Sequence, residues 1–220
     1  MTTLLRVDAS FRIEGSVSRG LADSAQAAWE AEHPNTKVVR RDLGLNPLPA
    51  DAWASAVSAS FAPADTHTPQ QRAALMLASA LLDELLDADA TIVAVPLYNY
   101  GISQHVKTWI DLLLADPRLR PGAGKPLIGR PAIIALARGG GYGPGTPREG
   151  WDHATPYLQR IFGDVLKMDV RITAAELTLA PVKPELADLI DLSKQSEAAA
   201  HEQANAHAQE IARRLALPAA

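Results

Sequence analysis

Short apolar runs alternate along the chain with longer amphipathic segments. The runs at 91–95 and 132–136 are continuously apolar, which is typical of strands buried on both faces of a parallel sheet. Similar short runs at 4–7, 36–40 and 170–173 are interpreted as three further strands, and the charges in 36–40 favour a sheet edge. This alternation predicts an α/β fold, with a five-stranded parallel sheet and helices on both faces.

Helical spacing marks the segments between these runs. A helix start is clearest at Thr68, which can cap, followed by Pro69 at the first helical position and Gln71, which completes a capping box. Further helices are predicted over 155–166 and 184–217. Other apolar positions form the buried stripes of two more helices: Leu21, Ala25, Ala28 and Trp29 in one, and Val106, Trp109, Ile110 and Leu113 in the other.

The segment 43–66 is too long for a simple connection between a strand and a helix. It contains several Pro residues and two aromatic side chains, Trp53 and Phe61. We expect it to form an excursion near a functional face or an interface.

Composition narrows the function classes. With 220 residues, 47% of them hydrophobic, the chain can bury one core, so a single domain over 1–220 is predicted. The absence of Cys excludes disulfides and thiolate metal sites, and no H-E-x-x-H motif exists, so no metal site is expected. A net charge of -4 argues against nucleic-acid binding. The N-terminus does not resemble a signal peptide and no apolar run reaches about 18 residues, so we expect a cytoplasmic protein without membrane contact.

Candidate chemistry lies in three loops. In open parallel sheets, ligands bind beyond the carboxyl ends of the strands. That rule selects a first loop at 10–18, a second loop at 96–101 and a third loop at 137–143. Because the strands are parallel, the three loops should lie at one edge of the sheet.

The first loop places Ser10, Ser16 and Ser18 around Gly15, immediately before a helix. A helix N-terminus offers unpaired N–H groups and a partial positive charge, so the loop suits a phosphate. The alternative is ordinary N-capping by Ser16 or Ser18, which leaves the other serines without a role.

The other two loops suit a flat, polar-edged ligand. In the second loop, Tyr98 and Tyr100 flank Asn99, whose amide can donate and accept hydrogen bonds while the rings cover a planar group. In the third, Gly139 and Gly140 allow backbone to lie against a ligand. The alternative for both loops is a plain turn, in the second case with the aromatic rings packed back on the sheet.

Together these segments resemble the FMN-dependent NADH:quinone oxidoreductase and azoreductase family, over nearly the whole chain. The resemblance implies a flavodoxin-like fold and a homodimer with FMN at the subunit interface. It also implies ping-pong two-electron transfer from NADH or NADPH to a quinone or an aromatic azo compound. The segments that carry it are Asp8-Ala9-Ser10, Gly15-Ser16-Val17-Ser18, Pro96-Leu97-Tyr98-Asn99-Tyr100 and Arg138-Gly139-Gly140.

The resemblance also implies residue roles. The phosphate of FMN would be held by Ser10, Ser16, Val17 and Ser18. Its ring system would be lined by Leu97, Tyr98, Asn99 and Tyr100, and its polar edge would be bound by Ala137, Arg138, Gly139 and Gly140.

The chain departs from the family pattern at three places. Ala137 stands where the family commonly has Ser. Tyr142 takes a place often held by His and is the candidate catalytic residue, as a hydrogen-bond donor to the flavin carbonyl edge. The segment 114–129 looks shortened and lacks aromatic residues on the substrate side. Phe162, Tyr100 and Trp151 are candidates for substrate-side walls or for plain core.

Two other functions fit the same pattern. One is a flavodoxin-type electron-transfer or FMN-binding module without nicotinamide turnover. The other is a phosphate-sensing or protein-interaction domain, because one fold can serve several functions.

Overall fold

The computed structural model describes residues 1–120 and 122–216 and contains one five-stranded, all-parallel sheet. The strand order is β2-β1-β3-β4-β5, so the charged β2 lies at an edge, as its composition predicted. The α/β class is confirmed. The strands are β1 Thr3–Asp8, β2 Lys37–Asp42, β3 Ala90–Pro96, β4 Pro131–Ala137 and β5 Asp169–Ala175.

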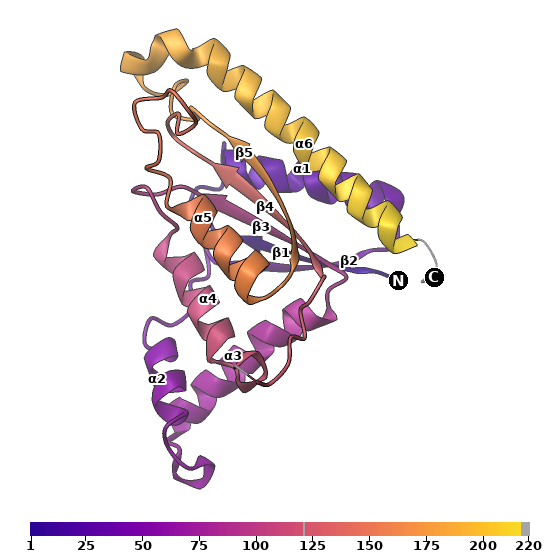
Figure 1. Ribbon diagram of the computed structural model, residues 1–220, viewed down its shortest axis with the longest axis vertical. Helices are drawn as coiled ribbons and strands as arrows, with labels where there is room; N and C mark the ends of the chain where they lie inside the picture. The colour runs from indigo at the N-terminus through magenta and orange to yellow at the C-terminus, as the bar shows by residue number, and fades with distance from the viewer. Residues whose placement is uncertain (121, 217–220) are drawn as a thin grey trace.

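Helices cover both faces of the sheet (Figure 1). The pair α1 and α6 packs on one face, and α3 and α4 pack on the other, with α2 against them. The helices are α1 Val17–Glu32, α2 Ala52–Ala59, α3 Pro69–Asp87, α4 Gln104–Ala115, α5 Ala154–Leu158 and α6 Ile190–Ala216. None of the helices described is long and apolar enough to cross a membrane.

The start of α3 follows the local rule. Thr68 Oγ1 accepts from the Gln71 backbone N–H at 3.2 Å, and the Gln71 side chain accepts from the Thr68 N–H at 2.8 Å. The capping box and Pro69 at the first position are therefore confirmed. Such a signal needs four consecutive residues and no tertiary contact.

The helix predicted over 155–166 is confirmed, but it is only partly an α-helix. An α-helical turn, α5, passes into a π-helix over Gln159–Val165, in which the Leu166 N–H donates to the Ile161 carbonyl at 2.9 Å. Three buried residues are spaced every four positions: Leu158, Phe162 and Leu166. A turn wider than 3.6 residues helps to keep all three on the face that meets the core.

The C-terminal helical segment begins with a 3-10 helix, Pro184–Leu189, and continues as α6. Residue 217, the last of the predicted segment, lies outside the described residues. The segment 43–66 contains α2, whose buried Ala52 and Ala56 join the core beneath α3 and α4.

The strand order creates the crevice in which a ligand can bind. From the end of β1 the chain turns to α1 on one face of the sheet, and from the end of β3 it turns to α4 on the other. Adjacent loops that part in opposite directions leave a hollow between them at the carboxyl edge.

Candidate functional site

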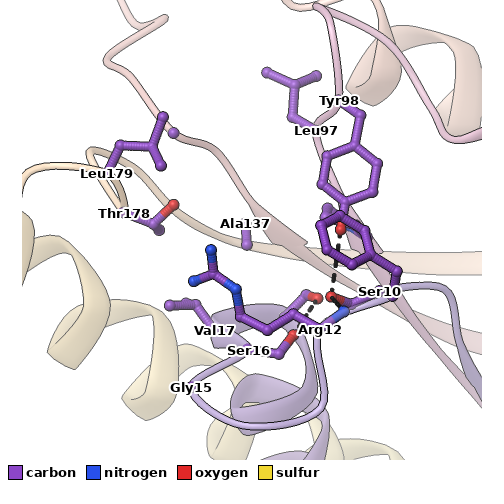
Figure 2. A pocket seen from close by; sticks show the side chains of 14 residues that line it. Ser10, Arg12, Gly15, Ser16, Val17, Leu97, Tyr98, Ala137, Thr178 and Leu179 are labelled. Carbon is purple, nitrogen blue, oxygen red and sulfur yellow. Dashed lines mark hydrogen bonds between the residues drawn. The ribbon is translucent and has the colours of Figure 1, made fainter. Parts of the chain in front are cut away.

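A pocket opens at the carboxyl ends of β1, β3 and β4 (Figure 2). The space between its side chains is about 610 Å³, a figure that includes the part open to solvent. The structure therefore brings the three predicted loops together. The lining residues are Ser10, Phe11, Arg12, Gly15, Ser16, Val17, Ser18, Pro96, Leu97, Tyr98, Ala137, Gly139, Thr178 and Leu179.

The serine hydroxyls at the start of α1 are available to a ligand. Ser16 is the N-cap residue, yet its side chain makes no capping hydrogen bond. Ser18 is 1% exposed, and its Oγ lies 3.4 Å from Ser16 Oγ, at the limit of a hydrogen bond. The capping alternative does not account for these hydroxyls, so an anion at this helix terminus is the better interpretation.

The first and second loops meet at Ser10. Its hydroxyl accepts from the Arg12 backbone N–H at 3.2 Å and lies 3.4 Å from the Tyr98 hydroxyl. The Tyr98 ring also packs against the Phe11 ring, with the two centroids 5.5 Å apart. The pocket therefore has a polar floor at the serines and an aromatic wall beside it.

Arg19, in the first turn of α1, fixes the backbone of the first loop. Its Nη2 donates to the Ser10 carbonyl at 2.6 Å, and its Nε donates to the Arg12 carbonyl at 3.1 Å. The same guanidinium binds Asp42 at the end of β2, at 2.7 and 2.8 Å. We call Arg19 and Asp42 the loop clamp, because Arg19, itself bound by Asp42, binds two carbonyl groups of the loop.

The charges of the loop clamp stabilise one another. The hydrogen bond to Asp42 raises the pKa of Arg19 above its ordinary value. Burial alone would raise the pKa of Asp42, but hydrogen bonds from Arg19 and from the Leu45 and Gly44 N–H groups hold that pKa below its ordinary value. Both groups are therefore charged at neutral pH.

Gly44 lies close to the backbone of the first loop. A Cβ at this position would lie 2.1 Å from the Ser10 carbonyl oxygen, a backbone atom that cannot rotate away. The Gly44 N–H donates to the Asp42 carboxylate at 3.1 Å. The backbone at Gly44 can thus approach Ser10 closely because glycine has no side chain.

The second loop is a tight hairpin turn. Tyr98 and Gly101 exchange backbone hydrogen bonds at 3.0 Å, and the two residues between them, Asn99 and Tyr100, have φ of 48° and 68°. Positive φ at both central positions defines a type I′ turn, which Asn adopts readily and Tyr does not. A tyrosine held there is a strained residue of the kind that collects at binding sites.

Next to the main pocket lies a second hollow that shares the Phe11 and Tyr98 rings. It is lined by Phe11, Tyr98, Asn99, Gly101, Ile102, Ser103, Gln104 and His105. Asn99, one of the predicted residues, therefore faces this second hollow rather than the main pocket.

Tyr100 and Tyr142 form part of an aromatic cluster at the rim. The Tyr100 ring meets Tyr142 at 6.4 Å and Trp151 at 5.5 Å, both edge to face. Tyr100 and Tyr142 are not among the residues that line either hollow. Of the three candidates for a substrate wall, Phe162 is fully buried against Trp109 and belongs to the core.

The third loop contributes fewer residues than predicted. Ala137 and Gly139 line the pocket, but Arg138 and Gly140 do not. The Arg138 guanidinium instead binds Glu176 at 2.9 Å and Asp152 at 3.0 Å, and so ties three rim segments together.

The reason for glycine at Gly139 also differs from the expectation. A Cβ there would lie 2.6 Å from Leu179 Cδ1, so the missing side chain makes room for leucine rather than directly for a ligand. Leu179 comes from the segment after β5, whose Thr178 N–H donates to the Arg138 carbonyl at 3.0 Å.

Four lining residues that the sequence reasoning missed are Phe11, Arg12, Thr178 and Leu179. Phe11 and Arg12 were within reach of that reasoning, because they directly follow Ser10. Thr178 and Leu179 follow the last strand in a segment with no glycine or serine pattern, and nothing local marks them.

The chemistry of the pocket suits a phosphate monoester joined to a flat ring. Hydroxyl donors, a helix N-terminus and Arg12 surround one end, and the lining residues include no carboxylate. Aromatic and apolar side chains, among them Leu97 and Tyr98, form the other end.

Comparisons with known proteins agree with this geometry. Residues 2–210 match the family described as "Flavodoxin-like fold". A protein of Frankia alni named "FMN-dependent NADH:quinone oxidoreductase" is 41% identical over 201 residues, which is 90% of this chain and 95% of the relative. One of the same name from Streptomyces avermitilis is 39% identical over 217 residues, 98% of this chain and all of the relative (100%). The crystal structure of an azoreductase from Bacillus anthracis superposes with a TM-score of 0.78 at 25% identity, over 96% of this chain and 100% of that one.

Proposed function

The chain belongs to the flavodoxin-like fold family, and from that membership and its pocket we propose that it is an FMN-dependent NADH:quinone oxidoreductase. It reduces quinones, and also aromatic azo compounds, with NADH or NADPH as the electron donor. The observation that carries this proposal is the pair of serine hydroxyls at the start of α1, which no capping bond uses and which face a pocket with an aromatic wall.

The residues present fit FMN. Ser18 is buried with a single weak partner, so a phosphate oxygen can take the hydrogen bonds that its hydroxyl does not make within the protein. We propose that Ser10, Ser16, Val17 and Ser18 hold the phosphate. Hydrogen bonds to a charged group contribute about 1.5–3 kcal/mol each, so this end anchors the cofactor.

The other loops orient the ring system. We propose that Leu97, Tyr98, Asn99 and Tyr100 line it, because Leu97 and Tyr98 line the main pocket and Asn99 lines the hollow beside it. Ala137, Arg138, Gly139 and Gly140 are proposed for its polar edge, in the case of Arg138 through the backbone, since its guanidinium is bound elsewhere. Tyr142, in contact with Tyr100, is the proposed hydrogen-bond donor there.

When bound, FMN supplies two-electron chemistry, accepting electrons from a nicotinamide and passing them to a quinone or azo acceptor in a ping-pong cycle. The protein supplies position and electrostatics. That division agrees with the pocket, which contains no carboxylate or histidine among its lining residues to act as an acid or base.

We further propose a homodimer. Large apolar side chains are exposed around the pocket: Phe11 is 64% exposed, Ile13 63% and Trp151 51%. A second copy would cover them and close the mouth of the pocket. Light scattering after size exclusion tests this, and a monomer at micromolar concentration would contradict it. The need for NADH also leads us to propose a cytoplasmic location.

The function is tested by two half-reactions under anaerobic conditions. The purified protein should carry flavin absorbance that bleaches on addition of NADH, and a quinone should restore it. A protein that binds FMN tightly but is not bleached by NADH or NADPH would instead be an electron-transfer module. A protein that binds no flavin would overturn the enzyme assignment.

A further inference from the structure

Arg12 is the one formally charged side chain among the described residues that line the main pocket. Figure 2 shows it extended into the space between the first loop and the third, with its guanidinium directed toward the middle of the pocket. The charged end of this side chain lies where a ligand in the pocket would meet it.

The backbone of Arg12 is fixed while its side chain is not engaged. Its N–H donates to Ser10 Oγ at 3.2 Å, and its carbonyl accepts from Arg19 at 3.1 Å. Across residues 1–120 and 122–216, its guanidinium makes no hydrogen bond or ion pair, not even with nearby Glu14. Arg6 and Arg19, by contrast, are both bound to carboxylates.

A positive side chain would complement the charge of a phosphate in this pocket. A phosphate monoester carries about −1.5 to −2 charges at neutral pH, whereas a helix N-terminus supplies about half a positive charge and serine hydroxyls supply none. The guanidinium of Arg12 would supply one further positive charge, which compensates most of the phosphate charge that the helix N-terminus leaves. Its planar set of N–H donors also suits phosphate oxygens.

We propose that Arg12 is a specificity-determining residue that selects the phosphorylated flavin, FMN, over riboflavin by neutralising the phosphate. This inference rests on the proposed function, because it concerns the same pocket. The serines position the phosphate, and the guanidinium of Arg12 increases the affinity for it by neutralising its negative charge.

Two consequences follow for the wild-type protein. Its affinity for FMN decreases as salt is raised, because a partly exposed charge pair is screened. Its much weaker affinity for riboflavin changes little with salt, because that molecule carries no charge for Arg12 to meet.

The test is a fluorescence titration of the flavin-free protein with FMN and with riboflavin. The variants are Arg12→Gln, Arg12→Lys and, as a matched control, Arg160→Gln. Arg160 is a 74% exposed arginine on the π-helix, paired with Asp164, so the control removes the same charge away from the pocket. Thermal melting of each variant verifies that it is folded.

We expect Arg12→Gln to raise the Kd for FMN at least tenfold, to change the Kd for riboflavin less than twofold, and to flatten the salt dependence for FMN. Arg12→Lys should keep most of the affinity, and Arg160→Gln should match the wild type. If the Kd values for FMN and riboflavin rise equally, Arg12 acts by its shape and not by its charge. If the Kd for FMN is unchanged, the side chain does not contact the phosphate. Either result overturns the proposal, whereas a wild-type protein that binds neither flavin overturns the proposed function itself.

Discussion

Ser16 and Ser18 show how a residue can be placed for a ligand rather than for the fold. A serine before a helix normally satisfies one of the first free N–H groups with its hydroxyl. Here the N-cap hydroxyl makes no such bond, and the hydroxyl two residues later is buried with one contact at 3.4 Å. The side chains therefore contribute little to the folded state by themselves.

Replacing Ser18 by Ala should weaken FMN binding while leaving the protein folded. The variant loses a hydrogen bond to a charged group, so we expect the Kd for FMN to rise about tenfold to a hundredfold. The melting temperature of the flavin-free protein should change by less than about 2 °C. Fluorescence titration and thermal melting measure the two effects.

A matched control is Ser24→Ala, in the same helix. The Ser24 hydroxyl lies 2.7 Å from His201 Nδ1 between α1 and α6, away from the pocket. Its removal should leave the affinity for FMN unchanged. If Ser18→Ala binds FMN as tightly as the wild type, the phosphate assignment is wrong.

At the scale of elements, the loops are held in place by groups outside the pocket. The loop clamp joins α1 to the end of β2 and binds two carbonyl groups of the first loop. Its members are not themselves lining residues, so any effect on the cofactor passes through the backbone of Ser10 and Arg12.

Replacing Arg19 by Gln should therefore lower both stability and FMN affinity. We expect a loss of about 1–3 kcal/mol in the free energy of unfolding at pH 7, because Asp42 and two carbonyl groups lose a charged donor. The Kd for FMN should rise about tenfold. Denaturant unfolding and flavin titration provide the two readouts, and an unaltered Kd would mean that the loop holds its shape without the clamp.

The clamp also has a predicted pH dependence. The pKa of Asp42 is lowered in the folded protein, so its contribution to stability is fully present above the ordinary aspartate pKa of about 3.9. That contribution is lost as the pH falls through the lowered value. The difference in stability between the wild type and Arg19→Gln should accordingly be constant from pH 6 to 8 and shrink below about pH 4.

The second loop combines strain with exposure. Tyr100 has a φ of 68° and is 39% exposed, although its carbonyl accepts from the His153 N–H at 2.8 Å. Glycine would fit the turn better, since Asn-Gly is a preferred type I′ pair. A tyrosine kept at such a position indicates a use for its ring.

Tyr100→Gly should thus separate stability from function. We expect unfolding free energy to stay within about 1 kcal/mol of the wild type, because relief of strain offsets the lost contacts with Tyr142 and Trp151. The Kd for FMN or the KM for the quinone should rise several-fold. A variant that is both less stable by more than 2 kcal/mol and fully active would show that the ring serves packing.

How far an element could be predicted from sequence depended on how local its cause is. The start of α3 was predictable because Thr68, Pro69 and Gln71 satisfy one another. The π-helix over Gln159–Val165 was not, because no side-chain cap marks where its wider turn begins. Thr178 and Leu179 were missed for the same reason, since they reach the pocket by pairing with the third loop.

For the whole molecule, the strand order decides where chemistry can occur. In the order β2-β1-β3-β4-β5, β1 and β3 are neighbours, and the loops that follow them turn to opposite faces of the sheet. The third loop follows β4, which lies next to β3. The alternation of apolar runs predicted the sheet and its edge strand, and hence the convergence of the loops. It did not predict that Arg138 and Tyr142 lie at the rim rather than in the pocket, because side-chain directions there follow from contacts with Asp152, Glu176 and Tyr100.

The central claim is that the three loops form one binding site for FMN, with the phosphate at the start of α1. A crystal structure of the protein with FMN tests it most directly. We predict phosphate oxygens within hydrogen-bond distance of the Ser16 and Ser18 hydroxyls, with the ring system alongside Leu97–Tyr100. A pocket that stays empty in crystals saturated with FMN, or a phosphate bound elsewhere, would contradict the claim.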